Sequence, residues 1–98
     1  MLDPLIHERT RLGILSLLLL HGELEFTELR EKLQVTDGNL AGHLRKLEDA
    51  GYVRVKKEFK GRRPCTTYRL TPQGKRALRD YLKEMRKILE EVEKGFEK

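Results

Sequence analysis

Apolar residues recur at helical spacing over residues 5–21, close to the start of the chain. They are Leu5, Ile6, Leu12, Ile14, Leu15, Leu17, Leu18, Leu19 and Leu20. Spacings of three and four residues bring side chains to one face of an α-helix, and the second half of this helix is apolar almost all round. The pattern therefore predicts a helix that is buried from more than one side and that ends at Gly22.

Two shorter amphipathic helices are predicted next. Thr27 and Thr36 are placed to cap their N-termini, and a short extended piece at residues 25–26 precedes the first. The inward leucines are Leu29 and Leu33 in the first helix and Leu40, Leu44 and Leu47 in the second. Gly51 follows the second helix at a position where helices often end. Two capped helices joined by about three residues are typical of a helix-turn-helix motif.

The spacing changes from helical to alternating after Gly51, which predicts a β-hairpin over residues 52–71. The alternating residues are Val53, Val55 and Phe59 in the first strand and Thr66, Tyr68 and Leu70 in the second. Gly61 and Pro64 in the connecting segment are typical of a turn. The same segment contains Lys60, Arg62 and Arg63, so the hairpin has a cationic tip.

A last helix is predicted over residues 72–96, with Pro72 at its first position, where the missing N–H of proline costs nothing. Its apolar residues follow heptad spacing and are Leu78, Leu82, Met85, Leu89, Val92 and Phe96. A helix this long cannot be covered by so small a domain. This favours packing against a second copy over folding back onto its own body. The predicted dimer interface combines this seam with Leu12, Leu15 and Leu19 of the first helix.

The positive charge of the chain is concentrated in the hairpin. The 98 residues carry a formal net charge of +5, and residues 52–69 contain seven bases and one acid, so the remainder is slightly acidic. A local basic segment beside a helix-turn-helix motif indicates nucleic-acid binding. The apolar fraction of 38% is too high for a disordered polyelectrolyte. No apolar run approaches the roughly 20 residues of a membrane-spanning helix.

Enzyme, metal and cofactor chemistry find no support in the sequence. His7, His21 and His43 fall on three different predicted helices without metal-ligand spacing, and the glycines form no nucleotide-binding pattern. Cys65 is the single cysteine, which excludes an internal disulfide and favours a cytoplasmic location. Cys65 is either an incidental small residue or a redox sensor whose pKa Arg63 lowers, and the lack of a resolving cysteine favours the first alternative.

Four stretches of the sequence, taken together, resemble the motifs of a known protein family. They are residues 36–40 (TDGNL), 43–48 (HLRKLE), 50–53 (AGYV) and 67–74 (TYRLTPQG). Their order and spacing resemble those of winged helix-turn-helix transcriptional regulators of the MarR, ArsR and PadR type, most of all the small MarR-like members. The resemblance implies one α+β, mostly α, domain over residues 1–98. It implies a recognition helix at residues 36–50, a wing at 52–71 and a dimerisation helix at 72–96.

The same resemblance implies a homodimer whose third helix enters the major groove while the wing touches the DNA backbone or minor groove. The implied DNA contacts are Thr36, Asp37, Asn39, Gly42, His43 and Lys46 in the helix and Lys60, Arg62 and Arg63 in the wing. Four of these positions, from Asn39 to Lys46, also form a polar stripe that includes residue types able to read bases. We therefore expect a sequence-specific repressor that binds a pseudo-palindromic duplex site without a metal or cofactor.

Two alternatives stay open at this point. A winged-helix module that binds proteins would use the apolar seam and the cationic wing for other polypeptides. A non-specific architectural DNA binder is favoured by Ala41 and Gly42, because relatives commonly carry polar or basic residues there. The sequence shows no polar cluster that calls for a small-molecule effector.

Overall fold

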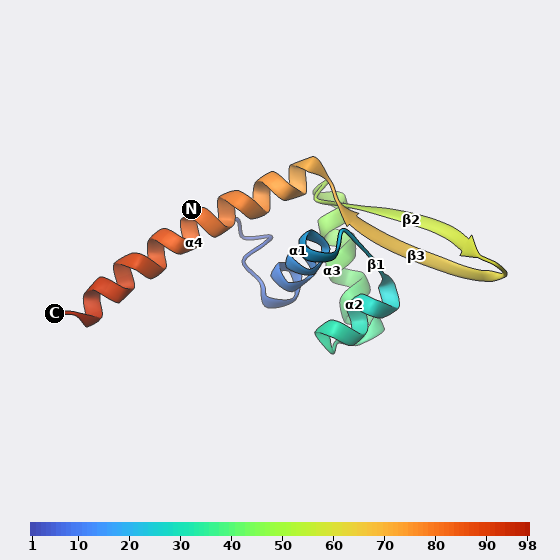
Figure 1. Cartoon of the computed structure of the whole chain (residues 1–98), viewed down its shortest axis with the longest axis horizontal. Coiled ribbons are helices and arrows are strands. Elements are labelled where there is room, and N and C mark those ends of the chain that lie inside the picture. The colour runs from blue at the N-terminus through green and yellow to red at the C-terminus, as the bar shows by residue number, and fades with distance from the viewer.

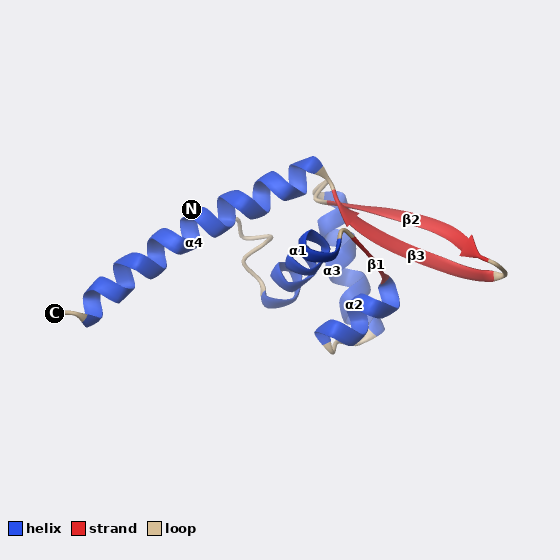
Figure 2. Cartoon of the chain, in the orientation of Figure 1, coloured by secondary structure: helices blue, strands red, loops and turns tan.

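The computed structural model describes residues 1–98 and contains four helices and three strands. In chain order they are α1 (Arg9–His21), β1 (Glu23–Glu25), α2 (Phe26–Leu33), α3 (Asp37–Asp49), β2 (Val53–Lys60), β3 (Arg63–Leu70) and α4 (Pro72–Phe96). Helices α1 to α3 form a body from which the β2–β3 hairpin and α4 extend in opposite directions (Figure 1), and the molecule measures 62 × 26 × 21 Å. Helix predominates (Figure 2), and the prediction of a mostly α winged helix fold with a long C-terminal helix is confirmed.

The three strands form one antiparallel sheet in the order β1-β3-β2. Pairing of Lys60 with Arg63 leaves Gly61 and Arg62 as the turn, and Gly61 has the positive φ (+66°) that glycine adopts without strain. The hairpin extends beyond the helical body (Figure 1), so the predicted alternation has different consequences along its length. Val53 at its base is buried, whereas Phe59 near its tip is 72% exposed.

The core forms where α1 meets the other elements. Helix α1 packs against α2, α3, α4 and the sheet, which agrees with the prediction that it is buried from more than one side. The fully buried side chains are Ile6, Ile14, Leu15, Leu18, Leu29, Leu40, Leu44, Leu47 and Leu78. Every helix contributes to this set, so the orientation of α3 and of α4 is fixed by one shared apolar cluster.

The predicted cap at Thr36 is present, and the structure adds a second threonine cap at Thr71. Thr36 Oγ1 accepts from the backbone N–H of Asn39 (3.1 Å) and starts α3. Thr71 Oγ1 accepts from the backbone N–H of Gly74 (2.9 Å) and starts α4. Each bond satisfies one of the N–H groups that the first turn of a helix leaves without a partner.

Two predicted helix starts are wrong. Helix α1 begins at Arg9 rather than at Leu5, because the Glu8 carboxylate caps it by accepting from the backbone N–H of Arg11 (2.7 Å). Ile6 still reaches the core from the turn before the helix. Helix α2 begins at Phe26, before Thr27, and the Glu28 carboxylate closes its first turn by accepting from the Glu25 backbone N–H.

The N-terminal segment, residues 1–8, ties the body to α4 and to the start of β2. His7 Nδ1 is hydrogen-bonded to the Tyr81 hydroxyl (2.8 Å) on α4. The Tyr52 hydroxyl donates to Asp3 Oδ2 (2.5 Å), and this bond raises the pKa of Tyr52 to about 12. The apolar residues of the segment therefore pack while its polar ones bind the neighbouring elements.

The apolar seam of α4 divides into a buried and an exposed part. Leu78 and Leu15 are at most 1% exposed within this one chain, which corrects the expectation that they face a second copy. Leu12 and Met85 are half-buried against the same core. The exposed members of the predicted interface are Leu19, Leu82, Leu89, Val92 and Phe96, and Ile88, which the heptad seam omits, is also exposed. None of the helices is both long and apolar enough to cross a membrane.

Gly74, in the first turn of α4, lies close against the backbone of Tyr52. A methyl group at this position would collide with the backbone carbonyl of Tyr52. We therefore expect Gly74→Ala to destabilise the protein by about 1–3 kcal/mol, measured as the free energy of unfolding in urea. Gly95→Ala is the matched control, because nothing lies within 4 Å of its added Cβ. It should leave stability unchanged or raise it by about 0.5–1 kcal/mol, and an equal loss in both variants would contradict the packing described.

Candidate nucleic-acid interface

Helix α3 presents its polar side to solvent. Leu40, Leu44 and Leu47 face the core, and the other residues of the helix are exposed except His43 and Glu48, which are half-buried. Of the predicted DNA contacts, those that the structure leaves exposed on or beside this helix are Thr36, Asp37, Asn39, Gly42 and Lys46. Two of them already serve the fold, because Thr36 caps α3 and Asp37 binds Arg30 of α2 (2.8 Å). Asn39 and Lys46 remain as the long polar side chains available for bases or phosphates.

His43 is positioned differently from the other predicted contacts. Arg11 Nη1 of α1 donates to His43 Nδ1 (2.9 Å), and Glu8 lies 3.7 Å from the same nitrogen. The His43 side chain is only 17% exposed. The His43 ring is therefore held between α3 and the N-terminus of α1, and a contact of His43 with bases stays a prediction. The bond from Arg11 links α3 to α1.

Arg45 is an exposed cation of α3 that the sequence analysis did not select. It lies opposite the inward leucines, one helical turn beyond Gly42 and Ala41. A helical projection centred on Leu40, Leu44 and Leu47 would have identified it. The centre of the outward face otherwise consists of small residues such as Gly38 and Gly42. Both glycines border open space, because an added Cβ at either position would meet nothing within 4 Å.

A polar groove lies beside α3, between its N-terminus and that of α1. Its lining includes Asn39 of α3 and the exposed Arg9 of α1. Arg9 therefore stands near a predicted base contact although it is 30 residues away in the chain. No group of three or more His, Cys, Asp or Glu side chains is arranged to hold a metal ion.

The three wing cations are all exposed, but they differ in whether they are paired with a carboxylate. Lys60 Nζ and Arg63 Nη2 lie 3.1 and 3.5 Å from Glu25 Oε1, which belongs to β1. The hydrogen bond to Glu25 raises the pKa of Lys60. Bonds from Cys65 and from Lys60 lower the pKa of Glu25, so Glu25 and Lys60 both keep their charges near neutral pH. Arg62, at the turn, takes part in none of the hydrogen bonds or ion pairs of the structure.

Cys65 lies beneath this cluster and donates from Sγ to Glu25 Oε1 (2.9 Å). The bond raises the pKa of the thiol, since ionisation would place a thiolate beside a carboxylate. The bond to Glu25 and burial outweigh the opposing effect of Arg63, which lowers the pKa, so the net upward shift contradicts the redox-sensor alternative. A buried thiol held in its protonated form is a poor nucleophile, so Cys65 is a structural donor to Glu25.

The comparisons with known proteins agree with this arrangement. A family model described as a winged helix DNA-binding domain matches residues 10–89. The chain is 40% identical over 83 residues to protein MJ0432 of Methanocaldococcus jannaschii, covering 85% of this chain and 90% of that protein.

Solved structures show the same similarity. A transcriptional regulator homologue from Pyrococcus horikoshii OT3 superposes with a TM-score of 0.85 at 28% identity, covering 90% of this chain and 87% of that one. A transcriptional regulator of the MarR family from Enterococcus faecalis V583 gives 0.74 at 28% identity, covering 93% and 81%. PadR from Bacillus subtilis, solved in complex with operator DNA, shares the fold, with a TM-score of 0.67 at 24% identity over 79% of this chain and 48% of that one.

Glu25 pairs with Lys60 and Arg63 in the free chain, and we expect it to compete with DNA phosphates for these two cations. We expect Glu25→Gln to tighten binding to a random-sequence duplex several-fold and to steepen its salt dependence, because two more cations become available to neutralise phosphates. Fluorescence anisotropy titrations at several salt concentrations measure both quantities.

Glu23→Gln is the matched control for this prediction. It removes the same charge from the same strand, but the Glu23 carboxylate accepts from Thr67 rather than from the wing cations. Equal effects of the two substitutions would show that only net charge matters and that the Glu25 pairing is irrelevant to DNA.

Proposed function

The chain belongs to the winged helix DNA-binding domain family and is thus a DNA-binding transcription regulator rather than an enzyme, and from that premise we propose that it acts as a homodimeric repressor of a pseudo-palindromic site. The observation that carries the proposal is the solvent-facing polar side of α3, anchored by its leucines and followed directly by a cationic wing. This arrangement presents a preformed helix to the major groove and cations to the phosphates.

Asn39, Arg45 and Lys46 are the side chains we assign to base and phosphate contacts from α3. Asn can bond adenine with two hydrogen bonds, and Arg or Lys can bond guanine or a phosphate. The wing supplies Arg62 directly, and Lys60 and Arg63 once they exchange Glu25 for DNA. Wing contacts contribute affinity without regard to sequence, whereas α3 contributes discrimination.

The exposed seam of α4 supports the dimer. Leu82, Leu89, Val92 and Phe96 are between 43% and 86% exposed along one helix. A continuous apolar surface of this kind marks an interaction site. A two-fold dimer would place two copies of α3 about 34 Å apart, the spacing of successive major grooves on one side of the duplex. Occlusion of the duplex by such a dimer is sufficient for repression.

A second candidate, non-specific architectural binding, is favoured by the small residues at the centre of the outward face of α3. Gly38 and Gly42 have no side chain and Ala41 has only a methyl group, so none of the three can form a side-chain hydrogen bond with a base. Selection from a pool of random duplexes at physiological salt separates the two candidates. Enrichment of a two-fold symmetric consensus supports the repressor. Enrichment of no consensus, with binding that depends only on salt, would replace it by the architectural binder.

Substitutions in α3 and in the wing should have different effects. Asn39→Ala should cost about 1–3 kcal/mol on the selected site and relax the preference at one base pair, while leaving binding to a scrambled duplex unchanged. Arg62→Ala should weaken binding to both duplexes and reduce the salt slope by about 1. Anisotropy titrations on the two duplexes measure these effects.

Lys87→Ala is the control for this pair of variants, because it removes the same charge from an exposed position on α4. We expect it to change neither affinity nor salt slope by more than a small amount. The assignment fails if Asn39→Ala weakens the selected and scrambled duplexes equally, or if Arg62→Ala behaves like the control.

The dimer itself has a direct test. Leu89→Glu combined with Val92→Glu places two carboxylates in the exposed seam without touching the core of the chain. Sedimentation equilibrium should then give the mass of one chain, where the unsubstituted protein gives two. An unsubstituted protein that sediments as a monomer at micromolar concentration would refute the homodimer.

A further inference from the structure

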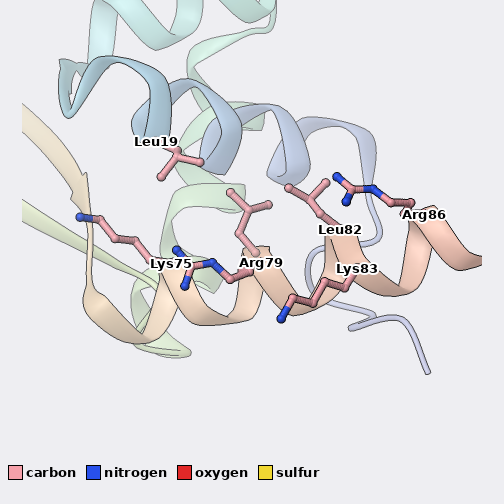
Figure 3. Close-up of a pocket in the computed structure, with 7 residues that line it drawn as sticks. Leu19, Lys75, Arg79, Leu82, Lys83 and Arg86 are labelled. Atoms are coloured by element: carbon pink, nitrogen blue, oxygen red, sulfur yellow. The ribbon is translucent and has the colours of Figure 1, made fainter.

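Phe59, near the tip of the wing, is an exposed apolar side chain that neither the core nor the proposed dimer covers. Apart from Phe59 and the terminal Met1, the well-exposed large apolar side chains lie on α1 and α4. They include Leu19 and Leu82, which point toward one another across an open groove of about 250 Å³ (Figure 3). The hairpin extends from the body in the opposite direction to α4 (Figure 1). A second copy that pairs along α4 therefore leaves Phe59 uncovered.

Phe59 continues the apolar face of the hairpin beyond the helical body. At the base of the hairpin, Val53 of β2 lies opposite Leu70 of β3, and both are buried in the core. Near the tip, Phe59 lies opposite Pro64, and both are exposed. Because side chains alternate between the two faces of a strand, these two pairs share the face that packs on the body. Phe59 and Pro64 thus form an apolar patch that overhangs the body and that the fold does not use.

The two faces of the wing differ in charge. On the face opposite to Phe59, the carboxylates of Glu25 and Glu58 bind cations of the wing. On the face of Phe59, the two strands carry no acid, and their one cation, Lys57, is exposed and takes part in none of the ion pairs. Arg62, also unpaired, stands at the turn next to this face. A DNA backbone that approaches the apolar patch therefore meets cations and no carboxylate.

The distance from α3 to Phe59 matches the spacing of the grooves of DNA. Strand β2 begins at Val53, four residues after α3 ends at Asp49. Phe59 is six residues further along the strand, which corresponds to ~20 Å at about 3.3 Å per residue. A major groove and the next minor groove are about half of the ~34 Å helical repeat apart. A wing that follows α3 onto the duplex thus brings the patch to the minor groove beside the major groove that receives α3.

We infer that Phe59, backed by Pro64, enters this minor groove as an apolar wedge that partly unstacks one base step and bends the duplex. Apolar side chains that insert in this way bend DNA by ~20–90° toward the major groove. Lys57 then lies beside a phosphate, and Arg62 lies in the groove. The inference rests on the contact of α3 and the wing with DNA given under the proposed function, but not on the homodimer or on repression. It adds a second source of specificity, the deformability of the base step that receives the wedge.

A wedge and a purely cationic wing prefer opposite sequences. Pyrimidine–purine steps such as TA unstack easily, so a wedge favours them, whereas an inserted arginine favours stiff A-tracts with a narrow, strongly negative minor groove. Two duplexes that differ only in the minor groove beside the α3 contact, one with TA steps and one with an A-tract, separate the two preferences. We expect the unsubstituted protein to bind the TA duplex several-fold more tightly and Phe59→Thr to lose this preference. Tighter binding of the A-tract duplex by the unsubstituted protein would overturn the wedge.

Energy transfer between dyes at the two ends of the TA duplex measures the bend directly. At saturation, the unsubstituted protein and Phe59→Leu should shorten the distance between the ends, and Phe59→Thr should not. The two variants are matched controls for each other, because threonine keeps high strand propensity without a wedge, whereas leucine is a wedge with lower strand propensity. A role of Phe59 in the hairpin alone predicts the reverse order, which would overturn the inference. Circular dichroism checks that both variants are folded.

The salt dependence of affinity gives an independent readout. Phe59→Thr should weaken binding to the TA duplex roughly fivefold or more and leave the salt slope unchanged, because phenylalanine neutralises no phosphate. Arg62→Ala should lower the slope instead. A protein that binds both duplexes unbent, and equally well after Phe59→Thr, overturns the wedge while the proposed function stands. A protein that binds neither duplex overturns both.

Discussion

The burial of α1 is the constraint on which the rest of the molecule depends. Ile14, Leu15 and Leu18 lie on a helix that touches the helix-turn-helix motif on one side and α4 on the other. Because these contacts belong to one apolar cluster, α3 and α4 cannot be rearranged separately without opening a cavity, at a typical cost of 2–5 kcal/mol per large side chain. Helix α3, which we propose to face DNA, is thereby rigidly linked to α4, which carries the exposed seam.

Carboxylates determine which polar groups remain free for partners. Glu25 holds Lys60, Arg63 and Cys65, and Asp37 holds Arg30 beside the start of α3. Through these pairs the chain neutralises three of its 21 Lys and Arg side chains locally, two of them in the wing. The net charge of +5 is therefore a poor guide to the number of cations that reach DNA directly. Arg62 on the wing and the unpaired cations of α3 and α4 remain for other molecules.

Features that depend on a few neighbouring residues could be predicted from the sequence. The caps by Thr36 and Thr71 involve a hydroxyl and an N–H three residues later, and the turn at Gly61 depends on its own backbone. Features that depend on distant partners could not. His43 faces inward because Arg11, 32 residues earlier, binds its ring. Similarly, Glu25 and the wing meet only after β1 pairs with β3, and Leu78 is buried because α1 covers it.

The central claim is that two copies of α3, linked through α1 and α4, bind two half-sites on one side of a duplex. Hydroxyl-radical footprinting on a site selected from random duplexes tests it most directly. The account predicts two protected patches whose centres lie about 10 base pairs apart, at a stoichiometry of two chains per duplex. A single patch bound by one chain, or protection without a fixed spacing, would contradict it.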